Sequence, residues 1–259
     1  MDDATIALLA AAGFAGGILT TIIGGASLIT FPAMLAAGLP PVLATASNAV
    51  AMTPSSFVGA AVDYRRLPPW NPALHRVIAV GVIGSALGAC LLLWTPEQAL
   101  KKLIPVLLGL ATAMFAYAAR IRSFIFRHGD DPAMHSARAD RLGLILLAPV
   151  NVYGGYFGAG MGVMLLAILS LGQRGDFRTI NVLKNLLSGL SGIVAVIIFI
   201  SSGTVAWPQT LSMAAGGLIG GYVGGRVAGV IPEQFIRWVV IIAGSTITVV
   251  YAQRYWRGA

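Results

Sequence analysis

Residues 181–200 read NVLKNLLSGLSGIVAVIIFI, and Lys184 is the only charged residue in this stretch. A helix that crosses a lipid bilayer needs about 20 predominantly apolar residues, which is the length of this run. The stretch therefore predicts a membrane-spanning helix. It also raises the question of why a full positive charge lies inside that helix.

The rest of the chain has the same character as this stretch. Its 259 residues are 57% hydrophobic and only 10% charged, whereas soluble domains carry about 25% charged residues. No Asp, Glu, Lys or Arg occurs between Asp3 and Asp63, between Arg141 and Arg174, or between Lys184 and Arg226. The alternating pattern of about 10 residues that marks membrane β-strands is absent. We therefore expect an all-α, polytopic helical membrane protein.

The apolar runs predict about eight segments, and two of these are too long for one straight span. The expected segments are 4–37, 42–62, 73–93, 103–119, 142–172, 179–201, 209–230 and 235–253. The first segment contains Gly24, Gly25 and Pro32, and the fifth contains YGGYFGAGMG at 153–162. Because glycine weakens a helix and proline removes a backbone donor, we expect both segments to be broken or re-entrant. Whether they cross the bilayer fully stays open.

An internal repeat emerges when the chain is aligned with itself so that Gly24 falls on Gly160. In this alignment TPEQ at 95–98 falls on IPEQ at 231–234. Gly81, Gly84 and Gly88 fall on Gly217, Gly220 and Gly224, where small residues favour close helix packing. We expect a first transmembrane repeat at 1–119, a polar cytoplasmic linker at 120–141 and a second transmembrane repeat at 142–259.

Duplicated halves that each open with a glycine-interrupted segment are typical of transporter sites. Irregular backbone survives in a membrane only where it is buried in protein or lines a cavity. The free N–H groups at the start of a half-helix favour an anion. The glycines expected to line such a site are Gly24, Gly25, Gly158, Gly160 and Gly162.

A polar face runs along each of two predicted helices. In the second half it comprises Asn181, Lys184, Asn185, Ser188 and Ser191, spaced by three or four residues so that they share one side. In the first half it comprises Thr45, Asn48, Met52 and Ser55 or Ser56. The alignment of the two halves places Thr45 on Asn181 and Asn48 on Lys184. The polar faces are thus equivalent in the two halves, and from them we select Thr45, Asn48, Ser55, Asn181, Lys184, Asn185 and Ser188 as candidate substrate ligands.

Lys184 has two interpretations. A charge at mid-membrane costs at least ~2.5–3.5 kcal/mol, and no acidic residue of this chain is placed to neutralise it. A bound anion would supply the missing charge. Alternatively, Lys184 lies about six residues after Arg178, roughly 9 Å along a helix, and its side chain could reach the membrane surface.

Three stretches resemble the TauE/SafE sulfite exporter family: GGYFGAGMGV, NVLKNLLSGL and ATASNAVAMTPSSFVGA. The resemblance covers about residues 10–253, and its most specific part is Asn181, Lys184 and Asn185. It implies a secondary permease for sulfite, sulfonates or related organic anions in a bacterial plasma membrane. One departure is Ala26, which follows Gly24 and Gly25 where the family usually has a third glycine.

The remaining features narrow the function class. The formal net charge of +8 comes from basic residues in short loops, which indicates membrane orientation and not a nucleic-acid partner. Enzyme motifs and paired intramembrane carboxylates are absent from the sequence, so we expect no enzymatic activity, no cofactor and no metal. A passive anion channel and an accessory membrane subunit stay as alternatives to a transporter. The expected partners are a small anionic substrate and the lipid bilayer, and the sequence leaves a homo-oligomer open.

Overall fold

The computed structural model describes residues 1–128, 137–172, 177–227 and 233–256. The side chains that it describes lie mainly outside 118–142, 171–176 and 228–239. Within these residues the regular elements are helices, apart from turns and connections. They are α1 (Asp3–Ile22), α2 (Ser27–Ala36), α3 (Pro41–Val62), the short 3-10 helix η1 (Tyr64–Arg66), α4 (Pro72–Trp94), α5 (Glu97–His128), α6 (Ala137–Tyr156), α7 (Met161–Gly172), α8 (Phe177–Ser201), α9 (Trp207–Val227) and α10 (Glu233–Trp256).

Each of the two overlong predicted segments forms a pair of helices, α1 with α2 and α6 with α7. The backbone between the helices adopts positive φ values, +90° at Gly24, +76° at Gly158 and +78° at Gly160. Only glycine adopts this conformation without steric cost, so these residues set where the helices stop. Pro32, which we expected to help break the first segment, lies inside α2 and does not interrupt it. The predicted linker 120–141 is partly helical, because α5 extends to His128 and α6 starts at Ala137.

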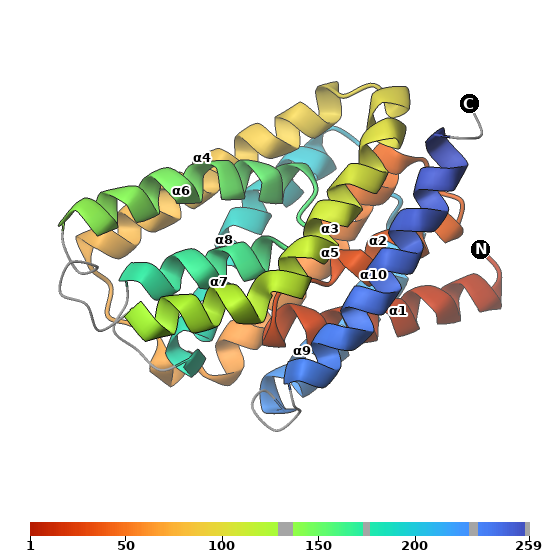
Figure 1. Cartoon of the computed structure of the whole chain (residues 1–259). Coiled ribbons are helices and arrows are strands. Elements are labelled where there is room, and N and C mark those ends of the chain that lie inside the picture. Colours follow the sequence, from red (N-terminus) through yellow and green to blue (C-terminus); the bar gives the residue numbers. More distant parts are fainter. Residues whose placement is uncertain (129–136, 173–176, 228–232, 257–259) are drawn as a thin grey trace.

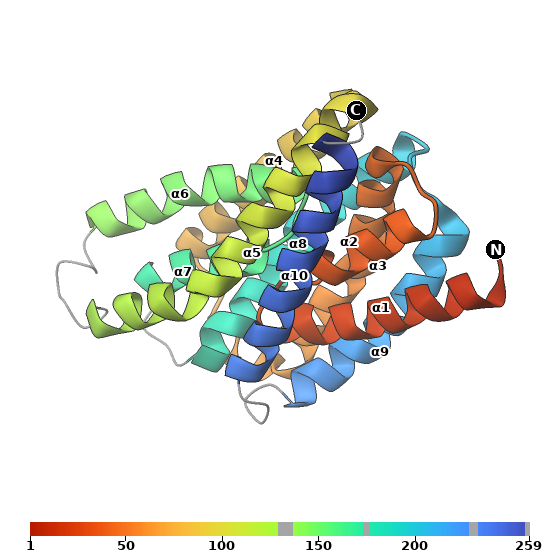
Figure 2. The ribbon, with the colours of Figure 1, turned by 45° about the vertical axis from the view of Figure 1, so that its right-hand side comes forward.

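The starts of helices α6 to α10 are spaced along the chain almost as the starts of helices α1 to α5 are. The two sets are interlocked in space. Helix α1 packs most extensively against α9, and α4 packs against α6. Helix α3 contacts both α9 and α8, while α5 crosses α10 (Figures 1 and 2). Neighbours in the sequence are therefore often not the closest neighbours in space.

Small residues bring the interlocked helices together. On α9, Gly216 and Gly220 lie against the backbone of α1 at Ala10 and Phe14. On α4, Gly88 lies against the backbone of α6 at Val152 in the same manner. These contacts agree with the packing role that the glycine spacing predicts, since small residues let membrane helices approach each other closely.

The outer faces of the helices carry large apolar side chains. On α4, Ile83, Leu87 and Leu91 are exposed. Four described helices are long and apolar enough to cross a membrane: Asp3–Ile22, Pro72–Trp94, Glu97–Tyr117 and Phe177–Ser201. Helices with small residues inside and large apolar residues outside suit a lipid environment, where the surroundings are as apolar as leucine. The chain is an integral multi-pass membrane protein.

The glycine contacts predict a specific loss of stability. A methyl group at Gly220 would collide with the carbonyl oxygen of Phe14, so Gly220→Ala should lower the free energy of unfolding by about 1–3 kcal/mol. In Gly109→Ala, the new methyl group would meet Thr248 at an ordinary 3.5 Å. The thermal unfolding midpoint of the detergent-solubilised protein should fall in the first variant only. Equal midpoints in the two variants would contradict the tight α1–α9 packing.

Candidate functional site

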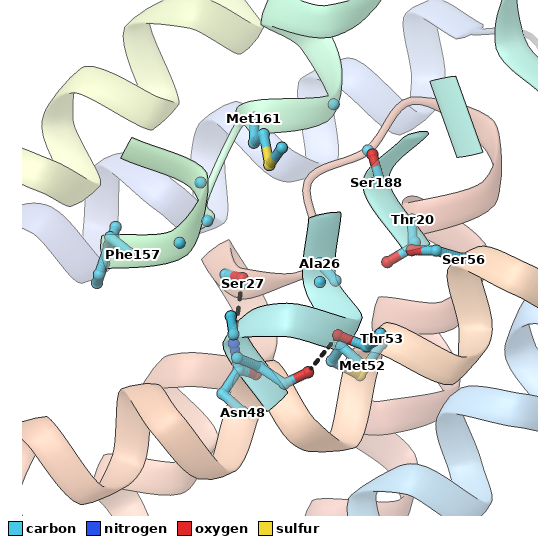
Figure 3. Close-up of a pocket in the computed structure, with 18 of the residues that line it drawn as sticks. Thr20, Ala26, Ser27, Asn48, Met52, Thr53, Ser56, Phe157, Met161 and Ser188 are labelled. Carbon is cyan, nitrogen blue, oxygen red and sulfur yellow. Dashed lines mark hydrogen bonds between the residues drawn. The ribbon is translucent and has the colours of Figure 1, made fainter. Parts of the chain in front are cut away.

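A cavity of about 110 Å³ lies between the helix breaks and the helices α3, α4, α6 and α8. The residues that line it are Thr20, Gly24, Ala26, Ser27, Thr45, Asn48, Ala49, Met52, Thr53, Ser56, Ser85, Gly154, Gly155, Phe157, Gly158, Met161, Gly162, Ser188, Gly192 and Ala195. Figure 3 shows Asn48 and Ser27 on one side of the cavity and Phe157 and Met161 on another. Because several chain segments far apart in the sequence converge here, the cavity is the best candidate for a binding site.

The two helix breaks meet at this cavity. A methyl group built on Gly24 would lie only 2.5 Å from the Cα atom of Gly162, so the break between α1 and α2 touches the start of α7. Residues at the start of α2 and of α7, including Ser27 and Met161, line the cavity wall. The N-terminus of a helix carries a partial positive charge, so two such ends face the same space.

Unpaired backbone donors lie at the first of these ends. The N–H groups of Leu28 and Ile29 donate to Gly25 O and Ala26 O at 3.2 and 2.8 Å. Among the described residues, no hydrogen bond satisfies the backbone N–H groups of Gly25, Ala26 and Ser27. Such donors at a helix start are ready to bind an anion, since the orphan N–H groups and the helix dipole act together.

Short polar side chains complete the wall. They are Thr20, Ser27, Thr45, Asn48, Thr53, Ser56, Ser85 and Ser188, and none of the lining residues carries a charge. The side chain of Asn48 is 2% exposed, and its Nδ2 donates to Ser27 Oγ at 3.1 Å. Its Oδ1 has no hydrogen-bond partner among the described residues. The cavity thus offers hydrogen bonds from neutral groups, with one buried acceptor unused.

Lys184 lies beside this wall but not in it. Its side chain is 1% exposed, and its Nζ donates to the carbonyl oxygen of Thr20 at 3.0 Å. Thr20 belongs to the last turn of α1, where carbonyl groups lack intrahelical partners and the helix dipole is negative. The ammonium group therefore stabilises the end of a half-helix, and it does not reach the protein surface.

Two asparagines on α8 act on the same helix end. Asn181 Nδ2 and Asn185 Nδ2 both donate to Thr21 O, at 2.9 and 3.2 Å. The end of α1 is thereby capped by three side chains from a helix in the other half of the chain. A glycine at position 59 makes room for this contact, because a methyl group there would lie 2.9 Å from Asn185 Nδ2.

The structure divides the predicted ligands into two groups. Thr45, Asn48, Ser188, Gly24, Gly158 and Gly162 line the cavity, whereas Lys184, Asn181, Asn185, Ser55, Gly25 and Gly160 do not. Ser55 Oγ donates to the carbonyl of Met52 in its own helix at 2.6 Å. Gly25 packs against the ring of Phe115, and Gly160 packs against Ala111.

Sequence reasoning missed several wall residues. Ser27 and Met161 flank the helix breaks, and the glycine pattern could have indicated them. Ser56 was named only as an alternative to Ser55. Ser85 lies on the glycine face of α4, and no periodic signal distinguishes it from a packing residue. Further along α8, Ser191 donates to Asn151 Oδ1 at 3.2 Å, and this hydrogen bond joins α8 to α6. Ser191 does not line the cavity.

Comparison with known sequences identifies the family. The sequence model of the Sulfite exporter TauE/SafE family matches residues 9–251. The chain belongs to this family, because the match extends over nearly its whole length. The broken helices and the polar face of α8, with Asn181, Lys184 and Asn185, lie within the matched region.

Curated bacterial relatives carry names of the same kind. The chain is 25% identical over 245 residues to a probable membrane transporter protein of Haemophilus influenzae, covering 94% of this chain and 92% of the relative. It is 28% identical over 247 residues to the probable membrane transporter protein ORF9 of a Sinorhizobium species, covering 94% and 91%. It is 25% identical over 233 residues to the probable membrane transporter protein YfcA of Escherichia coli K12, covering 90% and 84%. No solved structure matches the chain.

The contact between the two breaks yields a paired prediction. Gly24 and Gly38 both have positive φ, but only Gly24 is crowded, because nothing lies within 4 Å of a methyl group at Gly38. Gly38→Ala should cost about 1–2 kcal/mol of unfolding free energy from the left-handed conformation alone. Gly24→Ala should cost about 1–3 kcal/mol more, because the methyl group must push α7 away. Unfolding midpoints measure the difference, and equal losses would contradict the contact between the breaks.

Proposed function

We propose that this chain is a secondary transporter that carries a small oxyanion, such as sulfite or a sulfonate, through the cavity described above. The observation that carries the proposal is the convergence of two helix N-termini on one cavity whose described wall residues include no acidic side chain. Partial positive charges at these two helix starts favour an anion there, and none of the lining residues carries a negative charge that would repel it.

The wall chemistry supports an oxyanion in particular. Sulfur oxyanions present several oxygen acceptors in a compact group. Hydroxyl groups of Ser56, Ser85 and Ser188 and the free N–H groups near Ser27 provide donors from different directions. In this proposal Lys184 holds the end of α1, and its positive charge acts on the anion from behind Thr20.

The repeat suggests how the cavity opens alternately to the two sides. We propose two homologous four-segment halves, each with a broken first segment, which exchange helices across the cavity. One bundle then contains α1, α3 and α9, and the other contains α4, α6 and α8. The cavity wall draws on both bundles, with Asn48 from the first and Ser188 from the second. Rocking of one bundle against the other would expose the cavity to each side in turn.

A passive anion channel and an accessory membrane subunit are the competing functions. The channel would use the same helix ends, but it would need a continuous open path in one conformation. The accessory subunit would use its helices only as packing surface. Transport by the purified chain alone excludes the subunit, and counterflow excludes the channel, because only a carrier exchanges labelled substrate against a gradient.

Uptake into proteoliposomes tests the proposal directly. Sulfite, methanesulfonate, sulfoacetate and sulfate should be compared as labelled substrates at equal concentration. We expect saturable uptake of at least one of them, accelerated when the vesicles are preloaded with the same unlabelled anion. Unsaturable flux without acceleration would indicate a channel, and absence of flux for all four anions would reject an oxyanion transporter.

Variants of two serines on α8 distinguish a role in substrate binding from a role in helix packing. Ser188→Ala removes one wall hydroxyl and should raise KM about two- to tenfold, corresponding to the loss of a hydrogen bond of roughly 0.5–1.5 kcal/mol. Ser191→Ala removes the donor to Asn151 outside the wall, so it should lower the unfolding midpoint and leave KM unchanged. An unchanged KM in Ser188→Ala would remove that hydroxyl from the site.

A further inference from the structure

The two broken segments end their first helices in the same way. In α1, Leu19 O accepts hydrogen bonds from Ile23 N and Gly24 N at 3.0 and 2.7 Å. In α6, Tyr153 O accepts from Phe157 N and Gly158 N at 2.8 and 3.2 Å. Gly24 therefore corresponds to Gly158 in the structure, although the sequence alignment of the two halves paired it with Gly160. The next two carbonyl groups correspond as well.

Those next carbonyl groups are treated differently in the two halves. In α1, Lys184 Nζ donates to Thr20 O, while Asn181 and Asn185 donate to Thr21 O. Their counterparts in α6 are the carbonyl oxygens of Gly154 and Gly155. Among the described residues, no hydrogen bond reaches either of these two oxygens. The end of α6 thus lacks the cationic cap that the end of α1 possesses.

The helix that would supply such a cap in the first half is α3. In the sequence alignment of the two halves, its positions equivalent to Asn181, Lys184 and Asn185 are Thr45, Asn48 and Ala49. All three line the cavity, together with Gly154 and Gly155. The Lys184 side chain fills the space at the end of α1, whereas the equivalent space at the end of α6 is part of the cavity.

We infer that this part of the cavity is a binding site for a small monovalent cation, which takes at the end of α6 the place that the Lys184 ammonium takes at the end of α1. The ligands are the carbonyl oxygens of Gly154 and Gly155 and the buried Oδ1 of Asn48, which has no partner among the described residues. Carbonyl groups at a half-helix C-terminus carry partial negative charge and suit a cation.

The chemistry of these three ligands favours a monovalent cation over a divalent one. All three oxygens are neutral, whereas Ca²⁺ and Mg²⁺ sites usually include carboxylates, and none of the lining residues is acidic. An alkali ion or an organic ammonium group fits these ligands. The inference rests on the proposed function in one respect, because the cation would lie beside the oxyanion and enter with it. The ammonium could be a free ion or part of a zwitterionic substrate.

Thermal unfolding of the purified full chain, without any anion substrate, tests the site. The chloride salts of Na⁺, K⁺, methylammonium and the bulky N-methylglucamine are compared at constant ionic strength. We expect a saturable rise of the unfolding midpoint with at least one of the first three cations and none with N-methylglucamine. A rise with Na⁺ or K⁺ identifies an alkali ion, and a rise with methylammonium alone identifies an ammonium group as the ligand.

Variants at Asn48 show whether the rise comes from this site. Asn48→Lys places a tethered ammonium as Lys184 does in the other half, so the midpoint should no longer depend on the cation. Asn48→Ala removes one ligand and should weaken the apparent cation affinity about tenfold. If Asn48→Lys does not fold, this variant alone tests whether Asn48 binds the cation. Gln98→Lys adds the same charge at an exposed position of α5 and should respond as the wild type does.

Absence of a rise with all three cations, or an unchanged rise in the Asn48 variants, would overturn the inference. Its failure is separable from that of the proposed function. Sulfite uptake that continues without any cation effect on stability would reject the cation site only. A cation effect that is lost in the Asn48 variants, in a protein that transports none of the tested oxyanions, would reject the oxyanion function only.

Discussion

The structure depends on one constraint, which is that a helix interrupted inside a membrane must have its free backbone groups satisfied by something other than water or lipid. An unsatisfied peptide group costs several kcal/mol in hydrocarbon. At the end of α1 the partners are the side chains of Lys184, Asn181 and Asn185. At the starts of α2 and α7, no side chain among the described residues bonds the backbone N–H groups in this way, and there the chain forms a cavity. The candidate site therefore lies where helix ends have no side-chain caps, and the capped end of α1 lies beside it.

The interlocked packing keeps these ends together. Because α1 packs on α9 and α4 packs on α6, each broken segment is held by a helix that is distant from it in the sequence. The contacts are made through glycines and backbone atoms, so the helices approach too closely to slide freely past one another. This arrangement positions Gly24 against Gly162 and brings Asn48 of α3 and Ser188 of α8 to the same cavity.

The sequence predicted the helical membrane fold and the places where two segments break, because those features depend on local composition. Long charge-free runs and clustered glycines are visible without knowledge of any contact. The sequence also predicted one shared polar face on α8, but it could not show which of its residues contact which neighbouring helix. Asn181 and Lys184 contact α1, Ser188 lines the cavity and Ser191 contacts α6. Such a division depends on crossings between helices that are distant in the sequence, which periodicity does not encode.

Under the proposed function, the placement of Lys184 also bears on how the bound anion is released. Two unit charges 4 Å apart attract by about 4 kcal/mol at an effective dielectric constant of 20, and a directly paired anion would dissociate slowly. Here the ammonium donates to Thr20 O, and Thr20 lines the cavity whereas Lys184 does not. Its charge then raises the local potential without forming a contact that must break in each cycle. A site that must both fill and empty benefits from this arrangement, because binding has to be favourable enough for entry and weak enough for exit.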